Sequence, residues 1–237
     1  MISKFSLLLL SLFMSFATHA KSTSNYNSNS SKSNLYEKIE IIYKSIKTNN
    51  FELPEINCFK KAMDGFYNLK EKGLISKDIL TVIDFSLSST KKRLWVIDLS
   101  TNTILYNTLV SHGMKSGLEY ANSFSNSQSS NKSSLGFYAT GETYNGKHGL
   151  SLKLDGLEKG INNNARARAV VVHGAGYANS SFIKSQGYLG RSQGCPAIPE
   201  GLKAEIIQII KNKSCLFIYH PTKTYEIASK LMSQFHI

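Results

Sequence analysis

The chain has 237 residues and a formal net charge of +12, and its length is enough for one large domain with its own core. Three cysteines are too few for a disulfide scaffold. The charge favours anionic partners such as acidic polymers, but the basic residues are scattered and form no dense block. A basic surface that serves solubility alone is the alternative interpretation.

The first twenty residues are typical of a secretory signal peptide. Lys4 supplies a positive charge, an apolar run extends from Phe5 to Phe16, and the small residue Ala20 marks the cleavage site. The run is short for a membrane span, although a retained anchor is the alternative. We therefore expect a mature chain that begins at Lys21, is exported to the periplasm or cell envelope, and has no stable membrane insertion after cleavage. Nucleic acid is a poor partner for such a protein.

Residues 21–34 are almost all Ser, Asn and Lys, which predicts a disordered linker before a folded domain over residues 35–237. The domain begins with two predicted helices. Their apolar residues recur at helical spacing, namely Leu35, Ile39, Ile42, Tyr43 and Ile46 in the first and Phe59, Met63, Phe66 and Leu69 in the second. We expect Asn57 to cap the second helix and Gly73 to end it.

Strands follow the helices. Residues 79–85, 93–99 and 103–111 are short, rich in Val, Ile and Leu, and separated by polar turns, which predicts an antiparallel meander. Residues 121–134 are polar and aperiodic, and long loops of this kind are functional or disordered. Glycines then punctuate short β segments at positions 136, 141, 146 and 149.

The C-terminal third combines strand, loop and helix. Residues 168–172 predict a strand whose end delivers His173, and a Gly- and Ser-rich stretch leads from there to Cys195. Residues 199–211 predict a helix, and residues 215–219 a closing strand. The expected fold class is α+β and predominantly β, with helices at the start and near the end.

Two short segments carry candidate chemistry: His173-Gly174, and the run from Arg191 to Pro196 that contains Cys195. A thiol becomes a good nucleophile once ionised, and a nearby imidazole can accept its proton. Gly194 tolerates unusual backbone angles and leaves the sulfur accessible. The backbone N–H groups of such a turn can face a developing oxyanion. By spacing alone, a structural coincidence of one His and one Cys is the alternative.

The stretch from Val172 to Pro199 resembles the signature of the L,D-transpeptidase catalytic domain, in which His-Gly is followed by Ser-x-Gly-Cys, in its branch with Pro after the Cys. The resemblance covers about residues 59–220. It includes Val110-Ser111-His112-Gly113, Ser116-Gly117, Phe124-Ser125-Asn126, Ser133-Ser134-Leu135-Gly136, Gly141-Glu142-Thr143-Tyr144 and Gly146-Lys147-His148-Gly149.

The resemblance implies a role for each residue of the motif. Cys195 matches the acylated nucleophile and His173 the general base. The carbonyl of Gly174 would orient the His173 ring, as a carboxylate does in a Ser-His-Asp triad. Ser192 would help to shape the nucleophile loop.

The chain departs from the commoner branch of the family at two positions. Gln193 stands where that branch has a second His, and Ala197 where it has a polar residue. Substrate contacts drawn from the commoner branch are therefore not carried over to this chain.

Other residues are candidates for binding the substrate. His112 and His148 line the cleft or bond within their loops, and Tyr144 donates to the oxyanion or packs its ring. Arg168 and Arg191 suit a substrate carboxylate, with simple solvation as the alternative.

No His or Cys cluster has metal-ligand spacing, and no phosphate-binding Gly-rich loop precedes a helix, so we expect no metal and no cofactor. Cys58 and Cys215 are expected to be inert core residues, with a Cys58–Cys215 disulfide as the alternative.

The function that the resemblance implies is acyl transfer on peptidoglycan stem peptides through a thioester, which forms a crosslink between two third residues. One alternative is an L,D-carboxypeptidase or D-amino-acid exchange enzyme, in which water or a free D-amino acid is the acceptor. Another is a non-catalytic protein that binds the cell wall, which the His173–Cys195 pair argues against.

Overall fold

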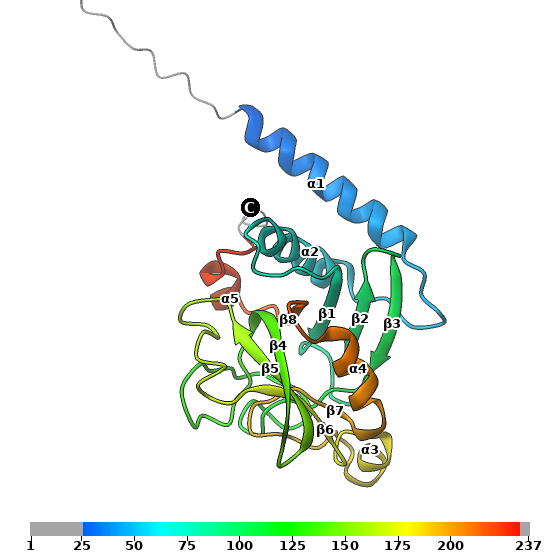
Figure 1. The fold of residues 1–237 in the computed structure, drawn as a ribbon, viewed down its shortest axis with the longest axis vertical. Coiled ribbons are helices and arrows are strands. Elements are labelled where there is room, and N and C mark those ends of the chain that lie inside the picture. Colours follow the sequence, from blue (N-terminus) through cyan, green and yellow to red (C-terminus); the bar gives the residue numbers. More distant parts are fainter. Residues whose placement is uncertain (1–25, 233–237) are drawn as a thin grey trace, which may run out of the picture.

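A computed structural model describes residues 26–232 of the chain (Figure 1). The predicted signal peptide, residues 1–20, and the start of the predicted linker, residues 21–25, lie outside the described residues. Within the described part, no helix combines the length and the apolar character that a membrane crossing needs.

Two helices open the described chain, α1 (Tyr26–Ser45) and α2 (Ile56–Glu71). Helix α1 begins earlier than the expected start at residue 35, and it includes residues 26–34 of the predicted linker. The buried side chains of Ile39, within the helix, and of Ile46, directly after it, secure its C-terminal half. Once such a helix is nucleated, each further residue adds a hydrogen bond, and neither Pro nor Gly interrupts the Ser/Asn tract.

Helix α2 is capped by Glu55, and the prediction of an Asn57 cap was wrong. The Glu55 carboxylate accepts hydrogen bonds from the backbone N–H of Asn57 at 2.8 Å and of Cys58 at 3.0 Å. A carboxylate at this end also complements the helix dipole. Gly73, at φ +65°, follows the last turn, which agrees with its predicted role in ending the helix.

The predicted meander is confirmed in the order β1 (Ile79–Asp84), β2 (Leu94–Asp98) and β3 (Thr103–Thr108), with antiparallel pairing throughout. Strand β8 (Cys215–Tyr219) does not close the sheet at an edge. It pairs in parallel with β1 and antiparallel with β4 (Gly136–Gly146), so the last strand of the chain joins the two halves of the sheet.

The second half of the sheet holds the sequence motif. Strand β4 forms a long hairpin with β5 (Gly149–Gly156), which pairs antiparallel with β6 (Val171–Ala175). Strand β7 (Ala197–Pro199) pairs in parallel with β6 at the edge. The described sheet therefore has eight strands in the order β3-β2-β1-β8-β4-β5-β6-β7.

His173 lies in the middle of β6 and not after its end as predicted. The strand begins late because the preceding residues form turns, in which Val170 N–H donates to Ala165 O at 2.9 Å and Ala169 takes φ +54°. His173 therefore has a strand on each side, with Ser151 of β5 and Ala197 of β7 as its register partners.

The remaining helices are short. The predicted helix over residues 199–211 is present as the 3-10 turn η1 (Glu200–Leu202) followed by α4 (Lys203–Ile210), whereas α3 (Ser180–Gln186) and α5 (Lys223–Ala228) were not predicted. The structure confirms the predominantly β, α+β class, with α2 covering one end of the sheet and α1 extending away from it (Figure 1).

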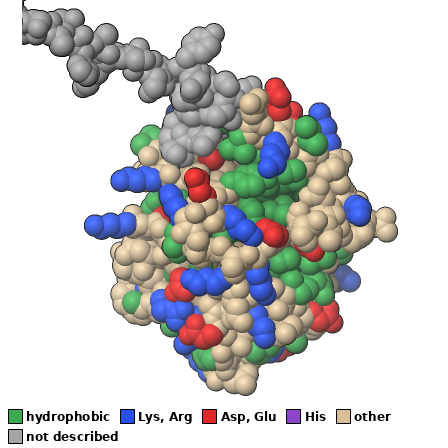
Figure 2. Space-filling view, turned by 45° about the horizontal axis from the view of Figure 1, so that its top comes forward, with side chains coloured by type: hydrophobic (Ala, Val, Ile, Leu, Met, Phe, Trp, Pro, Cys, Tyr) green, Lys and Arg blue, Asp and Glu red, His purple; other side chains and the backbone are tan. Residues whose placement is uncertain are grey.

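Cys58 and Cys215 are free and fully buried in the core, so the core interpretation of both holds and no disulfide joins them. On the face seen in Figure 2, Lys and Arg side chains are spread among acidic and neutral ones and form no single block.

Candidate active site

The turn that carries Cys195 is closed by one serine side chain. The hydroxyl of Ser192 donates to the carbonyl of Cys195 at 2.6 Å and accepts from the N–H of Gly194 at 3.0 Å. Gly194 takes φ +126°, and a Cβ there would lie 2.8 Å from the carbonyl oxygen of Lys132. A side chain at this position is disfavoured by both the backbone angle and the contact. Ser192 and Gly194 together fix the direction in which the thiol points.

Neighbouring loops hold this turn from outside. The N–H of Ser192 donates to the carbonyl of His112 at 2.9 Å, and the N–H of Met114 donates to the carbonyl of Ser192 at 2.7 Å. The hydroxyl of Ser133 donates to the carbonyl of Gly194 at 3.1 Å. These bonds fix the turn that carries Cys195, the candidate nucleophile turn, to the rest of the fold, because they give its backbone polar groups partners.

His173 is oriented by its own strand. Its Nδ1 lies 2.8 Å from the carbonyl oxygen of Gly174, the bond expected from the sequence. A carbonyl can only accept, so Nδ1 carries the proton and Nε2 keeps the lone pair that a base needs. Burial lowers the pKa of His173, and the nearby His148 and Lys147 lower it further, against the Gly174 hydrogen bond and Glu200, which raise it. The imidazole is therefore neutral at pH 7.

The thiol of Cys195 is bonded to the backbone at the start of β6. Its Sγ accepts from Val171 N–H at 3.4 Å and lies 3.6 Å from the carbonyl oxygen of Ala169, to which it can donate. Burial raises the pKa of the thiol, while the Val171 N–H, Arg168 and Lys147 act in the opposite direction. Cys195 is therefore a neutral thiol at pH 7, and it needs a base to react.

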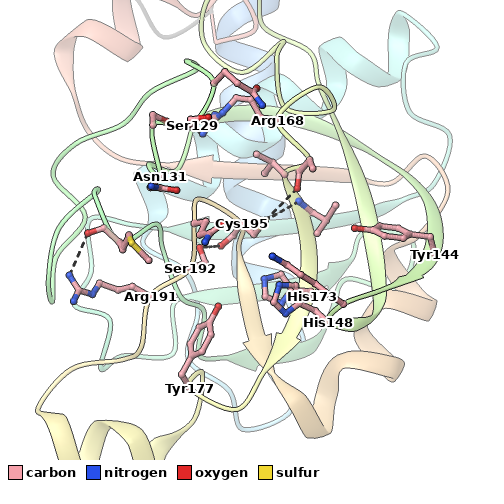
Figure 3. A pocket seen from close by; sticks show the side chains of 18 residues that line it. Ser129, Asn131, Tyr144, His148, Arg168, His173, Tyr177, Arg191, Ser192 and Cys195 are labelled. Atoms are coloured by element: carbon pink, nitrogen blue, oxygen red, sulfur yellow. Dashed lines mark hydrogen bonds between the residues drawn. The ribbon is translucent and has the colours of Figure 1, made fainter.

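The parallel pairing of β6 and β7 brings the two groups together. Ala197 pairs with His173, so Cys195, two residues earlier in the chain, comes beside Val171. Neighbouring strands lie about 4.8 Å apart. No hydrogen bond joins His173 to Cys195 in the described part of the chain, but both line the same pocket (Figure 3).

This pocket has a volume of about 520 Å³. Its lining contains three Lys and Arg side chains and no Asp or Glu among the described residues. Nor do those residues include a group of three or more His, Cys, Asp or Glu side chains placed to hold a metal ion. The lining residues are Met114, Gln128, Ser129, Ser130, Asn131, Tyr144, Lys147, His148, Arg168, Ala169, Val170, Val171, His173, Tyr177, Arg191, Ser192, Gln193 and Cys195.

Comparison with known proteins identifies the family. The family described as L,D-transpeptidase catalytic domain matches residues 52–219. The chain belongs to this family. No protein of the curated set matches the L,D-transpeptidase domain of this chain.

Solved structures of L,D-transpeptidases align with the chain at low identity. The protein from Mycobacterium smegmatis aligns with a TM-score of 0.37 at 14% identity, over 60% of this chain and 59% of that one. The protein from Mycobacterium tuberculosis H37Rv gives 0.35 at 11%, over 60% and 58%. The protein from Stackebrandtia nassauensis gives 0.37 at 9%, over 81% and 92%. This chain thus spans about three fifths of the length of the two mycobacterial proteins.

His112 was expected to line the cleft of the L,D-transpeptidase domain. It is instead fully buried and does not line the pocket. Its Nδ1 accepts from Arg93 Nη2 at 2.8 Å, and its Nε2 lies 3.2 Å from Gly117 O. Burial and Arg93 lower its pKa to about 4. His112 therefore supports the loop behind the nucleophile turn, and its assignment to substrate binding was wrong.

Arg168 also serves the fold. Its two terminal nitrogens donate to Ser125 O, Ser134 Oγ, Ser130 Oγ and Lys132 O at 2.5–3.1 Å, so the loop of residues 121–134 occupies them. This explains how an aperiodic polar segment becomes an ordered wall of the pocket. The Arg168 charge still acts on Cys195, whose thiol pKa it lowers.

Three other candidates do line the pocket. Arg191 makes only long hydrogen bonds, to Met114 O at 3.4 Å and Gly117 O at 3.3 Å, and so keeps donors for a ligand. Tyr144 lies at the far side of the opening from Arg191 (Figure 3). The ring of His148 is stacked on that of His173, with centroids 4.3 Å apart.

Lys147 and Tyr177 are among the pocket residues that sequence reasoning did not single out. Burial raises the pKa of Tyr177 to about 12, with the adjacent Cys195 adding to the shift. A signal for Lys147 existed, since it shares the glycine-bounded turn with His148. Tyr177 follows the motif histidine by four residues but lies outside any pattern of period or spacing.

Proposed function

We propose that the protein is a cysteine L,D-transpeptidase that transfers acyl groups between peptidoglycan stem peptides. One observation carries the proposal: the thiol of Cys195 and the oriented imidazole of His173 line one pocket that contains Lys147 and Arg191 and, among the described residues, no carboxylate. Such a pocket suits a peptide with free carboxylates and supplies a nucleophile and a base in one place. Family membership supports the same reaction class.

The first half-reaction forms a thioester. On binding, the thiol of Cys195 leaves the Ala169 carbonyl and gives its proton to Nε2 of His173. The sulfur then attacks the carbonyl carbon at the L centre of the third residue of the donor stem. The tetrahedral intermediate collapses, the bond to the terminal D-amino acid breaks, and the amine departs with the proton from His173. Base and acid are thus one imidazole used twice.

Backbone N–H groups of the nucleophile turn are candidates to stabilise the oxyanion of that intermediate. The N–H of Gly194 is engaged by Ser192 Oγ. Among the residues that the structure describes, the N–H of Cys195 donates to no acceptor, so it remains available at the reacting carbon. A fixed donor at this point lowers the barrier because it needs no reorganisation during the reaction.

The second half-reaction transfers the acyl group. The side-chain amine of the third residue of another stem attacks the thioester, His173 accepts the proton of that amine, and Cys195 returns to the thiol. The product is a crosslink between two third residues. Arg191, with free donors, is proposed to bind a substrate carboxylate, and Tyr144 is proposed to contact the peptide at the other side of the opening.

The site of action is the cell envelope. The predicted signal peptide over residues 1–20 and the cell-wall substrate both support export to the periplasm or envelope.

Mass spectrometry of purified disaccharide tetrapeptides after incubation with the protein tests the proposal. The expected products are a dimer that has lost one terminal D-amino acid, together with that amino acid. Tripeptide without dimer would identify a carboxypeptidase, and incorporation of an added D-amino acid would identify exchange. Unchanged substrate and no acyl adduct on Cys195 would indicate a wall-binding protein without catalysis.

A further inference from the structure

The hairpin formed by β4 and β5 lies outside the His173-Gly174 and Cys195 segments in sequence, but it contacts His173, the proposed base. Its loop has only two residues, Lys147 and His148, between the paired Gly146 and Gly149. Gly149 takes φ +68°, a conformation that suits glycine at the end of so tight a loop. The position of the His148 ring is therefore tied to a short loop on a paired hairpin.

The His148 ring covers one face of the base. The two imidazole centroids are 4.3 Å apart and the ring planes differ by 20°, which is a stacked arrangement. His173 is only 2% exposed, whereas His148 is exposed to solvent, so His148 lies between the base and water. The Gly174 carbonyl holds the edge of the His173 ring, and His148 holds its face (Figure 3).

We propose that His148 is a positioning residue for the base: its ring, delivered by the β4–β5 hairpin, clamps the imidazole of His173 in the plane that directs Nε2 to Cys195. Only the predicted effect on the acylation rate rests on the proposed function, because the stacking of His148 on His173 is a property of the free protein. Loss of the clamp would let the His173 ring turn about its Gly174 bond, and a base displaced by about 1 Å loses up to a hundredfold in rate.

Several charges face His173 and bear on its titration. Lys147 comes from the hairpin and Glu200 from η1, and Glu200 forms an ion pair with Lys203 of α4. Burial is the largest cause of the lowered His173 pKa, and the charges of His148 and Lys147 add to it. Removing the His148 ring exposes His173 to water, which weakens the effect of burial, and it also removes the His148 charge. Both changes raise the His173 pKa, because burial and the His148 charge are causes that lower it.

Two substitutions separate the ring from its charge. His148→Phe keeps a flat ring over the base, and His148→Ala removes it. The matched control is Asn145→Ala, an exposed side chain on the same hairpin that neither lines the pocket nor makes a side-chain hydrogen bond among the described residues. Single-turnover acylation of Cys195 by the tetrapeptide is measured across pH. Imidazole NMR titration gives the His173 pKa directly, with the signal assigned by its loss in His173→Gln.

The proposal expects His148→Ala to slow acylation at least about tenfold and to raise the titration midpoint of His173, moving the acidic limb of the rate profile to higher pH. His148→Phe should stay within about threefold of the unsubstituted protein, and Asn145→Ala should match it. Equal acylation by His148→Ala and the unsubstituted protein would overturn the proposal. So would a His148→Phe variant as slow as His148→Ala, since the imidazole would then act through a polar contact and not as a clamp.

The two proposals fail in different ways. If the unsubstituted protein does not acylate with stem peptides, the proposed function is wrong. The clamp is then tested by the His173 titration and by the pH dependence of Cys195 alkylation with iodoacetamide, neither of which needs a substrate. An identical His173 midpoint in His148→Ala and the unsubstituted protein would overturn the clamp whatever the activity.

Discussion

Gly194→Ala is the sharpest test of how the nucleophile turn is held. The substitution adds one methyl group to a residue at φ +126° and places it 2.8 Å from the carbonyl oxygen of Lys132. That oxygen already accepts a hydrogen bond from Arg168 at 2.7 Å, so it cannot move away without disturbing the loop that Arg168 holds. The turn must shift instead, and Cys195 shifts with it.

The expected cost follows from these two contacts. An L side chain at a sparsely populated positive φ costs about 1 to 3 kcal/mol. Weakening one buried hydrogen bond, at Lys132 O or within the turn, adds about 1 kcal/mol. We therefore expect a loss of about 2 to 4 kcal/mol in the free energy of unfolding. For a domain of this size, that loss lowers Tm by roughly 4 to 16 °C. A sulfur atom displaced by several tenths of an ångström should also acylate up to about a hundredfold more slowly.

Thermal unfolding of Gly194→Ala and Gly201→Ala, followed by circular dichroism, measures the first effect. Gly201 is the matched control, because a Cβ there would meet nothing within 4 Å. Its substitution should leave stability unchanged or raise it by less than about 1 kcal/mol. Acylation of Cys195 is followed by mass spectrometry in the same two proteins. Equal unfolding temperatures and equal acylation rates for the two variants would refute the reasoning.

Four further predictions concern the chemistry and the core. Cys195→Ala should retain the fold and form no covalent adduct, as intact-mass measurement of the protein incubated with donor peptide will show. His173→Gln should slow acylation by about a hundredfold or more. In the unsubstituted protein, the midpoint of the acidic limb of the kcat/KM profile should lie below pH 6.5, because His173 must be neutral to act as the base and its pKa is lowered. Lys147→Met should raise the pKa of the thiol, since it removes a positive charge that favours the thiolate, and alkylation rates against pH will detect the shift. Cys58→Ala and Cys215→Ala should keep acylation and lose about 1 kcal/mol each in urea unfolding, because both thiols are fully buried.

Periodicity predicted the local elements well and the sheet order less well. The strands over residues 79–85, 93–99 and 103–111 pair with their neighbours in the chain, so turns and alternation were enough to predict the meander. Strand β8 pairs with β1 across more than a hundred residues of chain, as in Leu80↔Cys215, and no local pattern encodes such a pairing. Helix α3 has seven residues and no buried side chain, so its sequence shows no apolar periodicity from which a helix could be predicted.

The candidate site divides in the same way. Cys195, His173, Gly174 and Ser192 lie in two short segments, and the resemblance alone predicted their arrangement, including the bond from His173 to the Gly174 carbonyl. His112 was wrongly predicted to bind substrate because nothing in the sequence indicates its hydrogen-bond partner. That partner, Arg93, lies 19 residues earlier in the chain, directly before β2, and belongs to no motif. The sequence around a histidine in a Gly-rich loop does not show whether its side chain faces a cleft or a buried guanidinium.

The resting site is a neutral pair, and this bears on how the reaction begins. Burial raises the thiol pKa of Cys195 and lowers the imidazole pKa of His173, so both shifts oppose a thiolate–imidazolium pair in the free protein. The thiol is directed to the Ala169 carbonyl and not to the base. In the proposed reaction, proton transfer therefore belongs to the complex with substrate, in which the peptide displaces water and the thiol turns toward Nε2. A thiol kept protonated in this way would also be less open to oxidants at the proposed cell-envelope location, because oxidation begins with the thiolate.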